Sequence, residues 1–183
     1  NKIMKKQKIC IVGGGLTGLV TAIGLSKLNC EIDIIINSNS ENTKSYRTIA
    51  VSENNFDFIS KLNISESLKK EMWPSSDMKL YTGIANGKFS EIFKFNGHNK
   101  NKRILYVIKN SKITKLMMRK IKKIKSITIK KYSKIFKIDN SGLMAKLKVD
   151  NNYYKYNLII LCTGSNSSLV EEHFQGNKIE NSY

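Results

Sequence analysis

The sequence predicts an α/β fold built on a parallel sheet, and three observations lead to that prediction. An apolar run, Ile9 to Val12, ends in the glycine-rich turn Gly13-Gly14-Gly15-Leu16-Thr17-Gly18. A helical apolar pattern follows this turn at once and leads into a second apolar strand, Glu31 to Ile36. Near the end of the chain, Leu158 to Leu161 is continuously apolar, as in a strand buried on both faces. Together they predict a βαβ unit whose sheet continues with later strands.

The turn has the spacing G-x-G-x-x-G in the strand-turn-helix context that is typical of dinucleotide binding. Gly13 allows the tight turn, Gly15 lets a pyrophosphate approach the backbone, and Gly18 lets the helix pack closely on the sheet. The free amides at the helix start, at Leu16 and Thr17, then face the phosphates. The alternative is a glycine-rich turn that binds no ligand.

The middle of the chain predicts helices and short strands inserted into this unit. We expect a helix with apolar spacing over 49–62, a second short helix over 65–72, strands over 78–82, 88–95 and 103–108, and a helix over 111–125. From residue 127 the pattern returns to strands. The first of these segments includes a third strand of the parallel sheet. In the next two segments apolar and polar residues alternate, as expected of an antiparallel excursion from that sheet.

Residues 111–125 form an amphipathic helix with an apolar stripe that includes Ile113, Met117 and Ile121 and with bases elsewhere. One interpretation is a helix lying on a membrane surface. The other, which we favour, is a helix that covers the nucleotide-domain sheet with a solvated basic face.

The composition is strongly basic, with a formal net charge of +18 over 183 residues. The bases are 29 Lys and only 3 Arg, accompanied by 20 Asn and 25 Ile, which suggests a compositional bias rather than an arginine-rich nucleic-acid surface. The charge still predicts salt-sensitive sticking to polyanions. Three cysteines without metal-ligand spacing, and no apolar run long enough to span a bilayer, favour a cytoplasmic protein with no metal site.

Four segments in this order resemble the flavin-dependent aromatic hydroxylases related to p-hydroxybenzoate hydroxylase, and most of all the ubiquinone-biosynthesis hydroxylases. They are the fingerprint within 8–36, the run Ser45-Tyr46-Arg47-Thr48-Ile49-Ala50-Val51-Ser52, the stretch Tyr106-Val107-Ile108-Lys109-Asn110, and Leu161-Cys162-Thr163-Gly164-Ser165-Asn166-Ser167-Ser168. The second run is similar to the family's D-x-R-x-x-A-L-S, and the last occupies the place of its D-G-x-x-S-x-x-R.

This resemblance implies a Rossmann-like FAD-binding domain over 1–77 and 109–183, with 78–108 as part of a β-rich substrate domain. It implies FAD as cofactor, NAD(P)H as co-substrate, and an aromatic or prenylated phenol, a ubiquinone precursor, as the ring hydroxylated with O2. Peripheral association with the inner membrane stays open, no specific nucleic acid is expected, and no side chain is identified as catalytic. The candidate cofactor-binding residues are Gly13, Gly15, Leu16, Thr17, Gly18, Asn37, Arg47 and Gly164.

The sequence departs from the family pattern at three positions. Asn37 stands where a ribose-binding Glu is usual, Thr163 replaces Asp, and Val170 replaces Arg. Asn can still accept a hydrogen bond, but without the charge of a carboxylate. Because the family's later G-D motif is missing, we expect an N-terminal portion or a reduced derivative.

Two other functions stay open. An NAD(P)-dependent oxidoreductase could use the same fingerprint, although it would have no need of the Arg47 run. A non-catalytic basic module that binds nucleotides or polyanions would show affinity that falls steeply with salt.

Overall fold

The computed structural model describes residues 6–38, 47–64, 68–84, 87–96, 103–132, 135–140, 142–164 and 167–174. The chain divides into two compact units, residues 1–44 with 117–183 and residues 45–116. These limits differ from the expected domains, 1–77 with 109–183 and 78–108, which were defined by the binding of flavin and substrate. That functional division stays a prediction.

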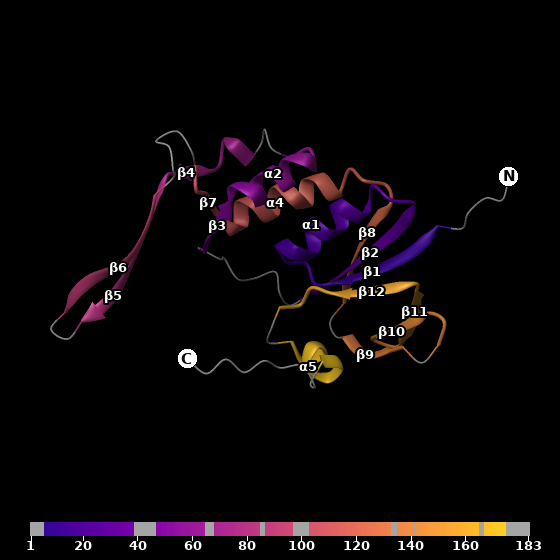
Figure 1. Ribbon diagram of the computed structural model, residues 1–183. Coiled ribbons are helices and arrows are strands. Elements are labelled where there is room, and N and C mark those ends of the chain that lie inside the picture. The colour runs from indigo at the N-terminus through magenta and orange to yellow at the C-terminus, as the bar shows by residue number, and fades with distance from the viewer. Residues whose placement is uncertain are drawn as a thin grey trace. The chain divides into compact units, whose positions relative to one another are not determined.

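The first unit is built on a four-stranded parallel sheet in the order β12-β1-β2-β8. Its strands are β1 (Gln7–Val12), β2 (Cys30–Asn37), β8 (Ile127–Tyr132) and β12 (Leu158–Leu161). Helix α1 (Leu16–Leu25) connects β1 to β2 and lies on one face of the sheet (Figure 1). The predicted βαβ unit and third parallel strand are therefore confirmed.

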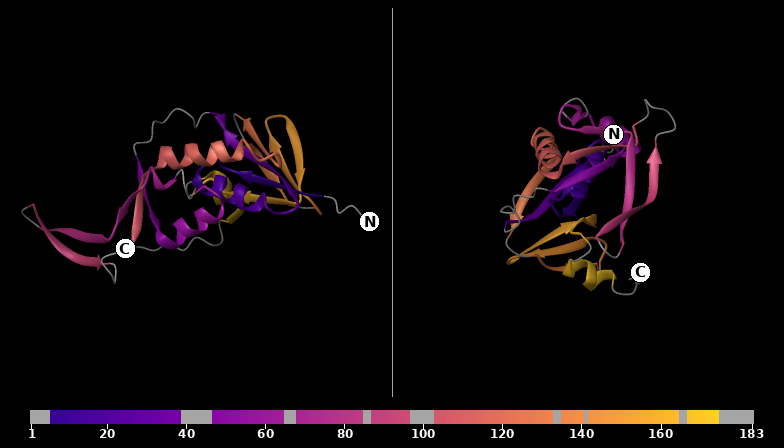
Figure 2. Two further views of the ribbon diagram at one scale, coloured as in Figure 1. Left: turned by 90° about the horizontal axis from the view of Figure 1, so that it is seen from above. Right: turned by 90° about the vertical axis from the view of Figure 1, so that its left-hand side faces the viewer.

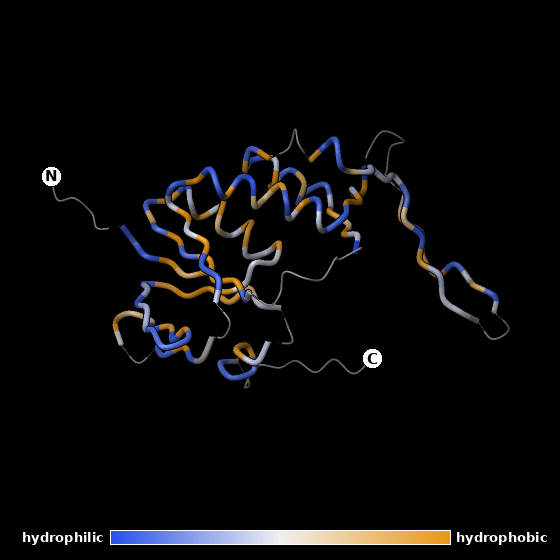
Figure 3. The backbone as a smooth tube through the Cα atoms, turned by 180° about the vertical axis from the view of Figure 1, so that it is seen from behind, coloured by the Kyte–Doolittle hydropathy of each residue, from blue (hydrophilic) through white to orange (hydrophobic). Residues whose placement is uncertain are grey.

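The opposite face of this sheet is covered by a three-stranded antiparallel sheet, in the order β11-β10-β9. Its strands are β9 (Ile135–Asp139), β10 (Ala145–Val149) and β11 (Asn152–Tyr156). The side chains of Cys10, Val12 and Ile35 share one buried cluster with residues of this smaller sheet. The central strands of the parallel sheet are correspondingly hydrophobic in Figure 3. The predicted antiparallel excursion is confirmed, and it encloses the second half of the core.

Strand β12 is less buried than its apolar sequence suggests. Leu158 is 48% exposed, and the three residues after it are only half-buried. The expectation of a strand buried on both faces was wrong, because β12 is the last strand in the sheet order rather than a central one. Helix α5 (Ser168–Phe174) follows it and adds Leu169 to the core.

The second unit contains a three-stranded antiparallel sheet, β3-β7-β4, and the helix α2 (Glu53–Lys61). The strands are β3 (Thr48–Ser52), β4 (Trp73–Ser75) and β7 (Leu105–Lys109). The helix expected over 49–62 is therefore wrong in its first turn. Residues 48–52 form a strand because they pair with β7, and the helix begins after Ser52, whose side chain accepts a hydrogen bond from the amide of Asn55. The short helix expected over 65–72 lies partly outside the described residues.

A two-stranded ribbon, β5 (Asp77–Ile84) and β6 (Lys88–Asn96), completes the second unit (Figure 2). Cross-strand partners place Met78 and Leu80 opposite Phe95 and Phe93, so one face of the ribbon is apolar. These four side chains are 42–56% exposed.

Helix α4 (Asn110–Ile121) carries the apolar stripe that was predicted for 111–125. Ile113, Met117 and Ile121 are at most 1% exposed. The stripe is buried in protein, which favours the packed helix over the membrane-surface helix. No helix within the described ranges is long and apolar enough to cross a membrane.

Candidate functional site

The turn between β1 and α1 needs glycine at Gly13 for two reasons. Its φ of +120° is a backbone conformation that side-chain-bearing residues rarely adopt. An added Cβ would also collide with the backbone carbonyl of Cys162, in the segment that follows β12. The amide of Gly13 donates to the carbonyl of Ile35 at 2.9 Å, which ties the turn to β2. Gly13 thus makes the tight turn that the sequence predicts.

The other two fingerprint glycines differ in what surrounds them. A Cβ on Gly18 would collide with the carbonyl of Gly13, so Gly18 permits close packing of the helix start on the turn. Gly15 has an ordinary extended backbone, and an added Cβ there would meet nothing within 4 Å. The fold itself places no demand for glycine at position 15. The remaining reason for a glycine at this position is the open space beside its backbone, which a ligand can approach closely.

The amino end of α1 carries no cap made by a side chain of the described residues. Its N-cap is Gly15, which makes no side-chain hydrogen bond, and its first turn holds no acidic residue. The first amides of a helix lack partners within the helix, and the helix dipole is positive at this end. The start of α1 is therefore suited to an anionic group.

The segment after β12 forms the opposite wall of this site. The amide of Cys162 donates to the carbonyl of Val12 at 2.7 Å, and Gly164 takes a φ of +87°. The side-chain oxygen of Thr163 is buried and has no hydrogen-bond partner among the described residues. A buried hydroxyl without a partner is unfavourable, so a hydrogen bond made to this oxygen would be stabilising.

These elements enclose a groove of about 900 Å³ at the carboxyl ends of the parallel strands. Its lining residues are Val12, Gly13, Gly14, Gly15, Leu16, Thr17, Ile35, Ile36, Asn37, Tyr132, Cys162, Thr163, Gly164, Ser167, Ser168 and Leu169. None of these lining residues carries a charged side chain, in a chain of net charge +18. Among the described residues, those that can bind an anion in this groove therefore offer backbone amides and uncharged polar side chains.

Six of the eight candidate cofactor-binding residues line this groove, and two do not. Gly13, Gly15, Leu16, Thr17, Asn37 and Gly164 are among the lining residues. Gly18 lies behind them, buried in α1, and Arg47 belongs to the second unit. The carbonyl of Arg47 accepts a hydrogen bond from the amide of Asn110 at 2.8 Å. The ligand role of Arg47 stays a prediction.

Sequence reasoning missed Tyr132 and Ile36 as lining residues. Ile36 packs directly beneath the turn, where a Cβ on Gly14 would come within 2.9 Å of its side chain. Tyr132 is the last residue of β8, whose carboxyl end meets the same edge of the sheet as β1 and β2. The position of Tyr132 at the end of a predicted parallel strand was the available signal.

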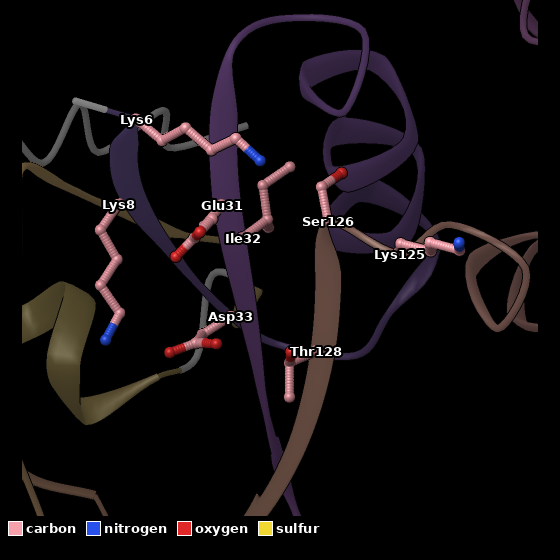
Figure 4. Close-up of a pocket in the computed structure, with 8 residues that line it drawn as sticks. All are labelled: Lys6, Lys8, Glu31, Ile32, Asp33, Lys125, Ser126 and Thr128. Atoms are coloured by element: carbon pink, nitrogen blue, oxygen red, sulfur yellow. The ribbon is translucent and has the colours of Figure 1, made fainter. Parts of the chain in front are cut away.

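A second cavity, of about 410 Å³, lies at the opposite, amino end of the same sheet (Figure 4). Three lysines and two acidic residues contribute to its lining: Lys6, Lys8, Lys125, Glu31 and Asp33. The ends of the three lysine side chains lie apart in the close-up and do not converge on one point.

Asp33 is the one buried charged residue of the described core, at 7% exposure. Its carboxylate accepts hydrogen bonds from the hydroxyl of Tyr156 and the ammonium of Lys130, both at 2.7 Å. Burial, together with the nearby Asp33, raises the pKa of the Cys10 thiol to about 12. Burial and the hydrogen bond to Asp33 also raise the pKa of Tyr156. The carboxylate is thus occupied in joining the two sheets of the first unit.

Comparison with known proteins identifies a family that matches most of the chain. Residues 6–173 match the family model described as FAD binding domain. No curated protein matches the chain.

Several solved structures share the fold at low sequence identity. The p-nitrophenol 4-monooxygenase PnpA from Pseudomonas putida DLL-E4 is 16% identical, with a TM-score of 0.68 over 89% of this chain and 42% of that chain. The flavin-dependent monooxygenase PieE, in complex with FAD and substrate, is 13% identical, with a TM-score of 0.71 over 92% of this chain and 32% of that chain. The 2-methyl-3-hydroxypyridine-5-carboxylic acid oxygenase is 18% identical, with a TM-score of 0.68 over 90% and 41%.

The chain therefore spans 32–42% of the length of these three proteins. Because the family model extends over most of the sequence and contains every lining residue of the groove, the chain belongs to the FAD-binding domain family.

Proposed function

We propose that this chain is the FAD-binding part of a monooxygenase that hydroxylates an aromatic ring, with NAD(P)H as reductant and O2 as the oxygen source. The substrate class we favour is a prenylated phenol, a precursor of ubiquinone. Support comes from the family of the domain, from the Arg47 run of the sequence, and from neighbours whose names describe oxygenases. A cytoplasmic site of action, peripheral to the inner membrane, belongs to the same proposal.

One observation carries the cofactor part of this proposal. The groove is open beside Gly15, where neither the backbone conformation nor the packing requires glycine. The amides at the start of α1, which no described side chain caps, offer hydrogen bonds in the same groove. The pyrophosphate of FAD, which joins the adenosine ribose to the ribityl chain of the flavin, fits such a lining, because it needs donors and close backbone approach more than countercharge.

Each part of the groove has a separate role in holding FAD. The Gly13–Gly15 backbone and the start of α1 would hold the pyrophosphate, and Asn37, at the end of β2, would accept a hydrogen bond from the adenosine ribose. FAD, when bound, supplies the oxygen-transfer chemistry. The chain contributes orientation and an apolar floor from Val12, Ile35 and Ile36 that limits access of water.

A pair of glycine variants tests the cofactor site. Gly15→Val fills the space beside the groove, whereas Gly24→Val places the same side chain later in α1, where a Cβ also meets nothing within 4 Å. We expect wild type and Gly24→Val to quench FAD fluorescence with equal dissociation constants. Gly15→Val should weaken FAD binding by about a hundredfold, because a blocked pyrophosphate loses several hydrogen bonds at once.

Other outcomes would point elsewhere. A wild-type chain that is colourless and takes up no added FAD contradicts the proposal. Tighter binding of NAD than of FAD would favour the NAD(P)-dependent oxidoreductase. Binding that ignores Gly15→Val and follows polyanions instead would favour the non-catalytic basic module.

The reductant and substrate classes need their own measurement. With FAD bound, anaerobic addition of NADPH or NADH should bleach the flavin absorbance if the nicotinamide is a co-substrate. A prenylated phenol should perturb the flavin spectrum at lower concentration than the same phenol without its prenyl chain. Equal effects of both phenols would argue against a ubiquinone precursor.

A further inference from the structure

Tyr132 is the aromatic side chain that the proposed FAD site leaves unexplained. It is the last residue of β8 and the register partner of Asn37, the last residue of β2. Partners in neighbouring parallel strands project to the same face of a sheet. Both residues accordingly line the same groove.

The ring of Tyr132 packs against a second aromatic ring. The ring of Tyr154, in β11, lies 6.1 Å away between centroids at an angle of 52°, and the ammonium of Lys130 lies 4.8 Å from the centroid of Tyr154. The hydroxyl of Ser38 donates to the carbonyl of Tyr132 at 3.4 Å. Burial, and contact with Tyr154, raises the pKa of Tyr132, so its ring is uncharged at neutral pH. Tyr132 is thus a supported, neutral aromatic surface at one end of the groove.

The order in which the parts of FAD would lie along the groove indicates which part would contact Tyr132. In the proposed complex, the pyrophosphate would lie at the start of α1 and the ribose of the adenosine half at the end of β2. The base attached to that ribose comes next, beside β8, the neighbour of β2 in the sheet (Figure 1). We propose that Tyr132 stacks against the adenine ring of the bound dinucleotide; this inference rests on the proposed function.

Three variants separate the ring from the hydroxyl and from nonspecific loss. Tyr132→Ala removes the ring, Tyr132→Phe keeps it, and Tyr153→Ala removes a ring of equal size in β11 that is 66% exposed and outside the groove. Because Tyr132→Ala removes the stacking surface, it should bind FAD and ADP about tenfold or more less tightly. Tyr132→Phe and Tyr153→Ala should bind both within about threefold of wild type.

Proton NMR of bound ADP gives a readout that does not depend on activity. Stacking on Tyr132 should shift the adenine protons upfield in wild type and Tyr132→Phe, and this shift should disappear in Tyr132→Ala. If Tyr132→Ala does not fold, Tyr132→Leu replaces it. The upfield shift of the adenine protons in wild type then still tests whether the base stacks on an aromatic ring.

Two results would overturn the inference. ADP that binds wild type without an upfield shift shows that the base lies elsewhere, while the proposed FAD site survives. Equal affinity of wild type and Tyr132→Ala for FAD would also show that the base lies elsewhere, while the proposed FAD site survives. A wild-type chain that binds neither FAD nor ADP overturns the proposed function as well.

Discussion

The two ends of the four-stranded sheet carry cavities of opposite construction. At the carboxyl end, the described residues that line the groove offer backbone, hydroxyls, the amide of Asn37 and apolar groups, and none has a charged side chain. At the amino end, five of the eight lining residues are charged, and Asp33 is already paired with Lys130 and Tyr156. The basic side chains that give the chain its net charge of +18 are therefore absent from the described lining of the groove that we propose binds an anion. The free amides at the start of α1, rather than lysine side chains, identify that site.

The largest expected effect tests whether the carboxyl end is built by its backbone. Gly13→Ala forces a side chain into a φ of +120° and against the carbonyl of Cys162, so the free energy of unfolding should fall by about 4 kcal/mol or more. Gly15→Ala, in open space, should change it by less than about 0.5 kcal/mol. Urea unfolding followed by circular dichroism measures both. Equal losses in the two variants would contradict the difference between these glycines.

The second prediction tests whether the amino end is built by its side chains. Asp33→Ala leaves Lys130 and Tyr156 without their shared partner, and removal of one member of a buried pair lowers the free energy of unfolding by about 3 kcal/mol. Glu31→Ala, an exposed acidic residue of the same cavity, should change it by less than about 0.5 kcal/mol.

FAD affinity provides the contrast between the two ends. The folded fraction of Asp33→Ala should bind FAD within about twofold of wild type, because Asp33 does not line the groove. A large loss of FAD affinity, with stability unchanged, would mean that the two ends are not independent.

The third prediction uses pH to address the same network. The folded-state pKa of Cys10 lies near 12 against an ordinary value of 9.0, and that of Tyr156 lies above its ordinary 10.0. Groups whose pKa is raised by folding stabilise the protein below their unfolded pKa and lose that contribution as the pH rises towards the folded value. Stability should therefore fall above pH 9, with a slope approaching about 1.4 kcal/mol per pH unit for each group.

Urea unfolding at pH values below and above 9 checks this slope. In Cys10→Ala the decline above pH 9 should be shallower, because the raised pKa values of Cys30 and Cys162 still contribute there, and Tyr156 adds its contribution above pH 10. A wild-type curve that stays level from pH 9 to 12 would contradict the buried state of both groups.

The sequence predicted one end of the sheet far better than the other. Gly13 to Gly18 and the flanking apolar strands are local signals, so the turn, α1 and the parallel pairing followed from spacing alone. Asp33 gave no such signal, because its partners Lys130 and Tyr156 lie 97 and 123 positions away.

The strand at 48–52 was missed for a similar reason. Ile49 and Val51 pair with Ile108 and Tyr106 of β7, a contact that the helical spacing of the following residues concealed. Pairing between distant segments overrode local propensity here. Tyr132 was overlooked because its place in the groove depends on the register of β8 against β2, which apolar spacing does not specify.

The smallest expected effect concerns salt, and it separates the groove from the basic surface. Binding that neutralises phosphates with lysines weakens steeply with salt, by about a hundredfold or more between about 50 and 200 mM for a polyanion such as heparin. No lysine or arginine is among the groove's lining residues in the described part of the chain, so the FAD dissociation constant should change by less than about threefold over that range. Fluorescence titrations of FAD and of labelled heparin, on the same preparation, measure both. A steep salt dependence for FAD would mean that lysines outside the groove hold the phosphates, and that the two ends of the sheet differ less than their linings suggest.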